Sequence, residues 1–207
     1  MRIVGGRWRR RNLASPPGLN TRPMPDRVRK AVFETIGSRW ETLGKLPPVR
    51  VLDVFAGCGA IGLEALSRGA RWCGFVERDH RALTGLRRNL SDLLGDEVAD
   101  LAQVLRTDAF RPTGWAPTLP HTSIELIFVD PPYRDSRDST PSGRVSRLLA
   151  SPAVAAILAD DSLVVLRHEA KVQYDRCAYG CLGATDVRRY GSMSITYMER
   201  SEGAGAS

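Results

Sequence analysis

The sequence predicts an α/β fold, and three observations support that prediction. The apolar run Val51–Val54 stops at glycines 57, 59 and 62, and a helical pattern of apolar residues follows at once. A second apolar run ends at Glu77, and a third, Ile124–Val129, ends at Asp130. A strand, a glycine turn and a helix in this order are typical of an α/β domain that binds a nucleotide-like ligand. Nearly continuous apolar strands are typical of a buried parallel sheet.

The elements before and after the glycine turn follow from local composition. Proline is tolerated in the first turn of a helix, so we expect a helix from Pro25. Its apolar residues recur at helical spacing and are assigned to the core: Val28, Val32, Ile36, Trp40 and Leu43. The segment Gly44–Pro48 ends this helix and leads into the first strand. Further along, we expect a strand at Trp72–Glu77, a helix over 79–94 and a strand at Leu101–Leu105.

The second half of the chain continues the alternation. Proline and glycine indicate a loop over 111–123, and the polar segment 134–143 indicates a mobile loop over the site. We expect a helix over 145–158 and a strand at Leu163–Leu166. Alternating apolar residues predict a closing antiparallel pair over 184–190 and 192–198, and residues 201–207 are expected to be a disordered tail.

Length and composition describe an ordinary globular protein. Of 207 residues, 43% are hydrophobic and 26% charged, enough for one substantial core with an appendage. No apolar stretch approaches the ~20 residues that span a bilayer, and the basic N-terminus is unlike a signal peptide. We therefore expect a cytoplasmic protein without a membrane segment. Its expected divisions are a basic arm and helix over 1–44, a main domain over 45–200, and the tail.

The four cysteines and three histidines show no spacing typical of a metal site, so we expect no metal and reduced, mostly buried thiols. Cys58 lies inside the glycine turn, where a small side chain is needed, and receives no catalytic role.

The net charge of +7 is concentrated near the N-terminus. Residues 1–40 contain ten Lys and Arg against Asp26 and Glu34, a net charge of +8, so the remainder is nearly neutral. Such a segment is typical of a nucleic-acid contact, and arginine suits it because its planar fork binds phosphate. Apolar residues interleaved with the basic ones argue against a merely solvated tail. Trp8 has two equally weighted readings, stacking on a base or filling a gap in the core.

The carboxylate of Asp53 discriminates between possible ligands of the glycine turn. It would repel the pyrophosphate of a dinucleotide and attract the ammonium and sulfonium of S-adenosylmethionine, so the sequence favours a methyl donor. Glu77, at the end of the next strand, stands where ribose hydroxyls of an adenosine ligand are bound in Rossmann-like domains. Asp108 could accept from an adenine amino group or cap the next turn, and the sequence leaves both open.

The motif Asp130-Pro131-Pro132-Tyr133 indicates chemistry on an exocyclic amine. Two prolines fix the backbone and remove N–H donors, so the turn offers carbonyl oxygens as acceptors. A carboxylate and a carbonyl that accept the two amine hydrogens would localise the nitrogen lone pair and leave it facing a methyl donor. The neighbouring aromatic ring could stack on the flipped base.

Four ordered motifs, spanning residues 2 to about 199, resemble the RsmD family of bacterial 16S rRNA guanine-N2 methyltransferases. They are Arg2–Arg9, Arg22–Arg29, Phe55–Ala70 and Asp130–Tyr133. The resemblance implies a Rossmann-like class I fold with a seven-stranded, mostly parallel sheet, one antiparallel strand and a small N-terminal basic extension. It also implies methyl transfer from S-adenosylmethionine to one guanine amine of 16S rRNA, in the small ribosomal subunit or its assembly intermediate, and we expect a monomer.

The resemblance also implies site residues. The target base would be held by Asp130, Pro131, Pro132 and Tyr133. The cofactor would be bound by Asp53, Phe55, Ala56, Gly57, Gly59, Glu77, Asp108 and Ala109. RNA would be bound by the basic arm and helix through Arg7, Trp8, Arg9, Arg10, Arg11, Arg22 and Arg27. The chain departs from the family pattern at Arg10, Met24, Pro25, Lys30 and Glu34.

Two alternatives remain open. The first is an adenine-N6 methyltransferase on DNA or RNA, because the Asp-Pro-Pro-Tyr motif serves amines of either purine. The second is a ribosome-assembly binding protein with a degenerate cofactor site, against which the intact glycines and Glu77 argue. A dehydrogenase is disfavoured by Asp53 and by the lack of a hydride-transfer constellation. The target nucleotide, and the choice between naked RNA and an assembled subunit, are left open.

Overall fold

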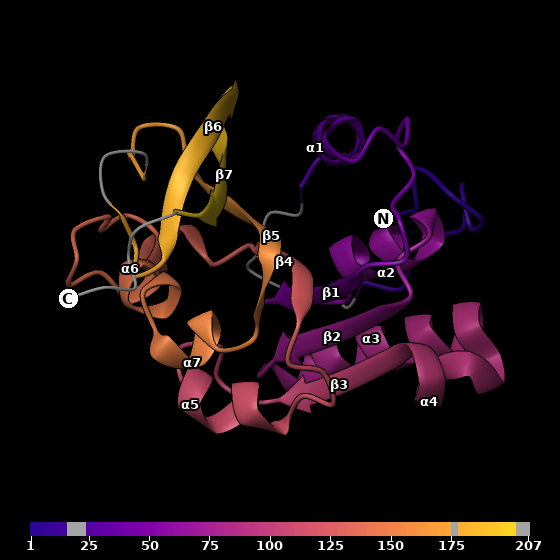
Figure 1. Ribbon diagram of the computed structural model, residues 1–207. Coiled ribbons are helices and arrows are strands. Elements are labelled where there is room, and N and C mark those ends of the chain that lie inside the picture. The colour runs from indigo at the N-terminus through magenta and orange to yellow at the C-terminus, as the bar shows by residue number, and fades with distance from the viewer. Residues whose placement is uncertain (16–23, 175–177, 202–207) are drawn as a thin grey trace. The chain divides into compact units, whose positions relative to one another are not determined.

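The computed structural model describes residues 1–15, 24–174 and 178–201, which fall into two compact parts divided between Thr107 and Asp108 (Figure 1). The first part contains α1 (Asp26–Arg39), β1 (Arg50–Val54), α2 (Ala60–Arg68), β2 (Trp72–Glu77), α3 (His80–Leu94), α4 (Val98–Leu101) and β3 (Ala102–Arg106). The second contains α5 (Pro112–Trp115), β4 (Ile124–Val129), α6 (Arg144–Leu149), α7 (Pro152–Ala155), β5 (Leu158–Glu169), β6 (Leu182–Tyr190) and β7 (Met193–Arg200). Short 3₁₀ helices occupy Gly95–Glu97, Ala116–Thr118 and Tyr133–Asp135.

In the first part, three parallel strands lie in the order β3-β2-β1. Apart from Asp53, the buried residues of β1 and β2 are apolar or glycine on both faces, as expected for a parallel sheet covered by helices. Leu52 and Phe75 in the strands are completely buried, as are Leu63 of α2 and Leu86 of α3. The helix expected over 79–94 is confirmed: Asp79 caps α3 by accepting from the backbone N–H of Ala82 at 2.9 Å.

In the second part, four strands lie in the order β4-β5-β7-β6. β4 and β5 are parallel, whereas β7 runs antiparallel to both β5 and β6, so the closing antiparallel pair is confirmed. Figure 1 shows β6 and β7, at the yellow end of the colour scale, as a hairpin. Seven strands are thus present in the described residues, mostly parallel and with β7 as the antiparallel one, and the predicted fold class is confirmed.

The basic N-terminal segment folds as a hairpin that packs on α2 of the first part. Ile3 donates to the carbonyl of Arg11 and Arg10 donates back to Ile3, both at 2.9 Å, while Ile3 and Leu13 are buried. The described part of the expected basic arm, residues 1–15, is therefore a hairpin. Residues 16–23 lie outside the described residues.

A buried ionic network joins this hairpin to α2. Glu64, which has no exposed surface, accepts from the backbone N–H of Val4 at 2.7 Å and from Nε of Arg68 at 2.7 Å. The Nε of Arg29, from α1, lies 3.6 Å from Oε2 of Glu64, the oxygen that accepts from Val4. Ser67 adds two hydrogen bonds, donating to the Gly5 carbonyl at 2.6 Å and accepting from the Trp8 N–H at 3.0 Å. Two polar side chains of α2, Glu64 and Ser67, therefore bond the backbone of the N-terminal segment.

Several element boundaries differ from the prediction. α1 ends at Arg39, and Leu43 is almost fully exposed, so its assignment to the core was wrong. The chain leaves the helix at Trp40, with positive φ angles at Glu41, Leu43 and Gly44. The helix expected over 145–158 is two short helices, α6 and α7, because Pro152 lacks the N–H that would continue the first.

Two further differences concern strand length and the predicted loop. β5 extends from Leu158 to Glu169, well beyond the four apolar residues that predicted it. The loop expected over 111–123 contains α5 and a 3₁₀ helix around a buried Trp115. Among the residues described, no helix is long and apolar enough to cross a membrane. The expected domain boundary between 44 and 45 and the expected tail over 201–207 stay predictions, and residues 202–207 lie outside the described residues.

Candidate functional site

The turn that follows β1 has an unusual backbone. Phe55, Gly57 and Gly59 have φ angles of 71°, 57° and 84°. A left-handed conformation at Phe55 is costly for a residue with a side chain and is a form of strain often found at ligand sites. The backbone N–H groups of Phe55 and Ala56 both donate to the carbonyl of Val76, at 3.1 and 3.0 Å. The turn is thereby fixed to the end of β2.

The three glycines of the turn differ in what surrounds the position that a Cβ would occupy. A Cβ on Gly62 would lie 2.7 Å from the sulfur of Cys73 and would collide with Phe75, so this glycine permits α2 to pack closely on β2. A Cβ on Gly59 would collide with Leu86 of α3. A Cβ on Gly57 would meet nothing within 4 Å. Gly57 therefore borders open space, where a ligand can approach the backbone.

Asp53 lies at the inner side of this turn and is 1% exposed. Its Oδ2 accepts from the backbone N–H of Gly62 at 2.9 Å, in the first turn of α2. A carboxylate in this position satisfies a helix N–H and interacts favourably with the positive end of the helix. Asp53 thus has a structural role that the sequence analysis did not foresee. Its predicted attraction for the cofactor ammonium stays a prediction.

Glu77 connects the glycine turn to the residues after β2. Its Oε2 accepts from the N–H of Gly57 at 2.8 Å, and its Oε1 accepts from the N–H groups of Arg78 and Asp79, both at 2.7 Å. Each carboxylate oxygen has two acceptor positions, so Oε2 retains one for a further donor such as a ribose hydroxyl. The half-buried side chain is held rigidly beside the open space at Gly57.

Asp108 and Ala109 begin the second part. The Oδ1 of Asp108 accepts from the N–H of Phe110 at 3.1 Å, and its backbone carbonyl accepts from Arg111 at 3.0 Å. The sequence left two roles open for Asp108. The structure shows one of them, capping of the turn that follows, whereas the contact with adenine stays a prediction. Ala109 is buried, and its carbonyl accepts from Nε1 of Trp115 at 3.2 Å.

Asp130 emerges from the end of β4 beside a buried arginine of β5. Val129 pairs with Leu166 in the parallel register, so the next residues along the two strands, Asp130 and Arg167, are neighbours. Oδ1 of Asp130 lies 2.6 Å from Nε of Arg167, whose side chain is only 6% exposed. Burial raises the pKa of Asp130 to about 6, and the positive charge of Arg167 opposes that rise.

Tyr133 shares the same arginine. The guanidinium carbon of Arg167 lies 5.3 Å from the centre of the Tyr133 ring, within the range of a cation–π interaction. The Tyr133 hydroxyl is buried and has no hydrogen-bond partner among the described residues. Arg167 therefore fixes the carboxylate and the aromatic ring of the Asp-Pro-Pro-Tyr motif relative to each other.

The segment after Tyr133, expected to be a mobile loop, is fixed by hydrogen bonds from the rest of the second part. The buried Tyr174 donates to the carbonyls of Ser136 and Asp138, at 3.1 and 3.3 Å, and burial raises the pKa of this phenol. Arg137 pairs with Glu169 at 3.0 Å. Gly143 is required, because a Cβ there would collide with the Asp138 carbonyl. These contacts hold the end of the motif in place.

Comparison with known proteins identifies the family. The family profile described as "Conserved hypothetical protein 95" matches residues 1–199. The chain belongs to this family, the RsmD family. It is 32% identical to the "Putative rRNA methyltransferase YlbH" of Bacillus subtilis over 97% of this chain and 99% of that relative. It is also 40% identical to the "Ribosomal RNA small subunit methyltransferase D" of Escherichia coli, over 65% of this chain and 61% of the relative.

Solved structures support the same fold. A structure titled "Putative methyltransferase yhhF from Escherichia coli" superposes on this RsmD-family chain with a TM-score of 0.71 and 26% identity. The superposition covers 98% of this chain and 99% of the other. The α/β methyltransferase fold predicted from the sequence is thereby confirmed.

Arg167 and His168 of this RsmD-family member were not singled out from the sequence. Both lie inside the buried part of β5. The His168 ring donates from Nδ1 to the Glu169 carbonyl at 2.9 Å, because a carbonyl can only accept, and Nε2 accepts from the Thr196 hydroxyl at 2.8 Å. The sequence offered one indication of Arg167: this charged residue directly follows the apolar run Leu163–Leu166 that predicted the strand.

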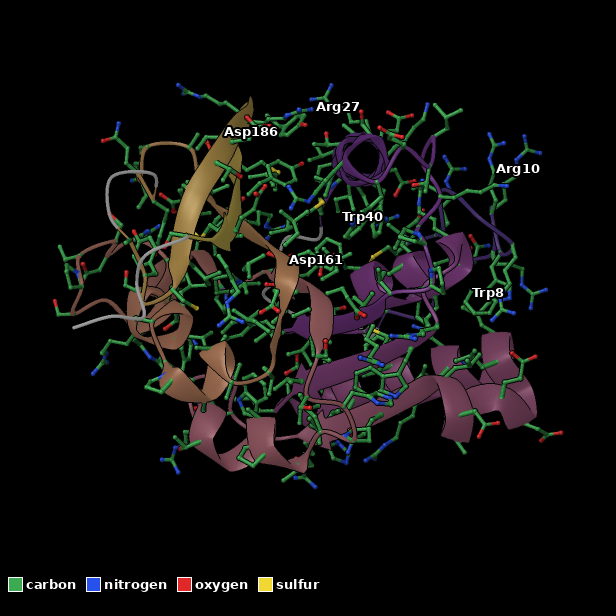
Figure 2. All side chains as sticks on the ribbon, viewed as in Figure 1. Trp8, Arg10, Arg27, Trp40, Asp161 and Asp186 are labelled. Atoms are coloured by element: carbon green, nitrogen blue, oxygen red, sulfur yellow. The ribbon has the colours of Figure 1, made fainter. Side chains whose placement is uncertain are left out.

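The predicted RNA contacts are mostly exposed. Figure 2 shows Arg10 and Arg27 pointing away from the ribbon, Arg10 from the N-terminal hairpin and Arg27 from α1. Arg9 is exposed as well. The guanidinium carbon of Arg7 lies 4.2 Å from the centre of the half-buried Trp8 ring. A guanidinium nitrogen of Arg11 donates to the Asp92 carbonyl at 3.4 Å. Trp8 therefore has one face covered by Arg7. Arg22 lies outside the described residues.

The described histidines, cysteines and carboxylates form no group of three or more that could hold a metal ion. Cys58, Cys73 and Cys181 are free thiols, and Cys177 lies outside the described residues. Burial raises the pKa of both Cys58 and Cys73, which keeps these thiols protonated and poorly nucleophilic.

Proposed function

We propose that this protein transfers a methyl group from S-adenosylmethionine to the exocyclic N2 amine of a guanine in 16S rRNA. The observation that carries the proposal is the arrangement at the end of β4. There Asp130 and Tyr133 are fixed by one buried arginine within a motif whose prolines leave carbonyl oxygens free to accept. Family membership and the names of the relatives support the reaction class and the RNA substrate.

The first part carries most of the residues proposed for the methyl donor, whereas Asp108 and Ala109 belong to the second part. The backbone at Gly57 borders open space, and Glu77 retains an acceptor position for a ribose hydroxyl. S-Adenosylmethionine has no phosphate, which agrees with a turn surrounded by the carboxylates of Asp53 and Glu77. When bound, this cofactor supplies the electrophilic methyl group. The contacts of Asp108 and Ala109 with adenine belong to the same proposal.

The second part carries the residues proposed for the acceptor. The carboxylate of Asp130 and a carbonyl of the Pro131-Pro132 turn accept the two amine hydrogens, so the nitrogen lone pair is no longer delocalised into the purine ring. Tyr133 stacks on the base. No covalent intermediate with the protein is needed, since positioning supplies most of the catalysis.

The exposed arginines of the N-terminal hairpin and α1 are proposed to bind the RNA backbone, with Arg7, Arg9, Arg10, Arg11 and Arg27 as the described members. Their hairpin is tied to α2 by the Glu64 network, so the basic surface is presented on a fixed support. The protein is proposed to act as a cytoplasmic monomer on the small ribosomal subunit or its assembly intermediate.

The test is to incubate the protein with radiolabelled S-adenosylmethionine and unmodified small-subunit particles, digest the RNA and identify the labelled nucleoside. We expect N2-methylguanosine at one position. N6-methyladenosine would instead establish the adenine-N6 alternative. Binding of the cofactor without labelling of RNA or DNA would favour the degenerate assembly protein.

A further inference from the structure

The second part contains a pocket whose arginines the proposed chemistry does not use. Its volume is about 380 Å³, and three arginines line it: Arg111, Arg144 and Arg147. Asp108, Phe110 and Ser151 also contribute to its wall. Three guanidinium groups against one carboxylate give the lining a net positive charge, in a part of the chain remote in sequence from the basic N-terminal segment.

Arg144 is held in a fixed position within this pocket. Its Nη1 lies 2.5 Å from Oδ1 of Asp135, and its guanidinium carbon lies 3.9 Å from the centre of the Phe110 ring. An arginine restrained by an ion pair and an aromatic face loses little further side-chain entropy when a ligand binds. Because Arg144 covers a face of Phe110, that face is not open to a nucleotide base.

Arg111 and Arg147 differ from Arg144 in having no charged partner. Both side chains are exposed, and neither makes an ion pair or side-chain hydrogen bond with the described residues. Two guanidinium groups without a charged partner among the described residues, beside a third that is held in place, suit phosphate oxygens chemically, because each arginine can donate two parallel hydrogen bonds. The methyl donor has no phosphate, and its one carboxylate does not require three guanidinium groups.

The pocket is also connected to the proposed catalytic motif. Asp135, which holds Arg144, belongs to the 3₁₀ helix Tyr133–Asp135 and lies two residues after Tyr133. Within this part of the chain, a group bound at Arg144 is therefore positioned relative to the ring proposed to stack on the target base. Phosphate contacts of this kind set the register of a nucleic acid without reading its sequence.

We propose that this pocket binds a backbone phosphate of the RNA strand close to the methylated nucleotide. The inference rests on the proposed function, since it assumes that RNA is the substrate. It assigns to the second part an RNA contact of its own, made by Arg111, Arg144 and Arg147, in addition to the basic N-terminal segment.

The test is the double variant Arg111→Ala/Arg147→Ala, assayed with unmodified small-subunit particles. We expect KM for the particles to rise about tenfold or more, and the slope of log affinity against log salt concentration to become shallower by about 1, since one phosphate contact is lost. The dissociation constant of S-adenosylmethionine should stay unchanged. The control is Lys171→Ala/Arg189→Ala, which removes two exposed positive charges of the same part from outside the pocket.

Lysine substitution separates the effect of positive charge from the effect of bidentate hydrogen bonding by arginine. Arg111→Lys/Arg147→Lys should restore the salt slope but only part of the affinity, because lysine binds phosphate as a point charge. A KM and a salt slope equal to those of the control variant would refute the inference. Weakened binding of S-adenosylmethionine would refute it as well, by assigning the pocket to the cofactor. Failure of the wild-type protein to methylate RNA would refute the proposed function and, with it, this inference.

Discussion

The proposed chemistry depends on the charge of Asp130, which two opposing effects determine. Burial disfavours the carboxylate and raises its pKa to about 6, while the guanidinium of Arg167, 2.6 Å away, favours it. Only the ionised carboxylate can form an ion pair with Arg167 and, at the same time, act as a strong acceptor for an amine hydrogen. The group is therefore ionised at neutral pH but protonated within a mildly acidic range.

The first prediction concerns the pH dependence of methylation. Since the raised pKa lies near 6, kcat/KM should increase with pH, reach half of its maximum near pH 6 and level off above pH 7. At pH 5 the value should be about tenfold lower than at pH 8, because only about a tenth of the carboxyl groups are ionised there. Initial rates across this range, with cofactor binding checked at each pH, test it. A flat profile between pH 5 and 8 would contradict it.

The second prediction concerns Arg167→Met. Methionine keeps an extended apolar side chain but removes the charge that lowers the pKa of Asp130, so the midpoint of the pH profile should move upward by about one unit. Arg167→Lys, which retains the charge, should leave the midpoint near that of the wild type. If Arg167 served only as packing, Arg167→Met would lower the rate at every pH without moving the midpoint.

Sequence reasoning found Asp130 but not Arg167, and the reason is physical. A strand-end carboxylate followed by two prolines and an aromatic residue is local, so the sequence displays it directly. The neighbour across the sheet depends on the register of β4 with β5, which pairs Val129 with Leu166 and is fixed only by the fold. Similarly, the sequence placed Asp53 at the glycine turn but could not show that it caps α2 through Gly62.

The N-terminal hairpin and α2 depend on each other. Gly5 and Gly6 lie against Arg68 and Ser67, where a Cβ on either glycine would collide with these residues, and Glu64 balances the buried charges of Arg29 and Arg68. A basic hairpin with few apolar residues is thereby held by polar contacts to one helix. Removal of the central carboxylate should consequently affect folding more than removal of any surface carboxylate.

The third prediction is that Glu64→Gln destabilises the protein by about 3 kcal/mol, because the buried guanidinium of Arg68 loses the carboxylate that balances it and Arg29 keeps only its ion pair with Asp26. Glu34→Gln provides the control: Glu34 is exposed, pairs with Lys30 at 3.4 Å and should cost less than about 0.5 kcal/mol. Urea unfolding monitored by circular dichroism gives both values. Equal unfolding midpoints for the two variants would show that the network contributes no more than a surface pair.

Helices and strands were predictable where only the apolar pattern determined them. They were uncertain where a second property, such as a proline, opposed that pattern. The strands β1, β2 and β4 have continuous apolar runs, and the structure has them within a residue or two of their expected positions. The apolar pattern over 145–158 suggested one helix, but Pro152 divides it. Leu43 matched the helical spacing of α1, yet the helix ends four residues earlier, which the spacing alone does not reveal.

Over the whole chain, the positive charge is the feature most directly linked to the proposed RNA substrate. The net charge is +7, and the sequence showed where most of it lies. The fold class was predictable because glycine turn, apolar strands and motif order all agreed, and family membership confirms it. The pocket lined by Arg111, Arg144 and Arg147 was not predictable, since its residues come from separate elements.

The fourth prediction concerns the basic hairpin. Binding to small-subunit RNA should weaken steeply with salt, and Arg9→Ala/Arg10→Ala should make the slope of log affinity against log salt shallower by between about 1 and 2. The control Arg87→Ala/Arg88→Ala removes the same charge from the exposed face of α3. Filter binding at several salt concentrations measures both. The same slope for wild type and the hairpin variant would exclude phosphate contacts by Arg9 and Arg10.

The most direct measurement is the single-turnover rate of methyl transfer by Asp130→Ala, beside its affinity for S-adenosylmethionine. The substitution should lower the rate by a factor of about 10² to 10⁴, because the amine loses its main hydrogen-bond acceptor. Affinity for the cofactor should stay within about twofold, since the residues proposed to bind it are separate from Asp130. A nearly unchanged rate, or loss of cofactor binding together with the rate, would contradict the role proposed for Asp130.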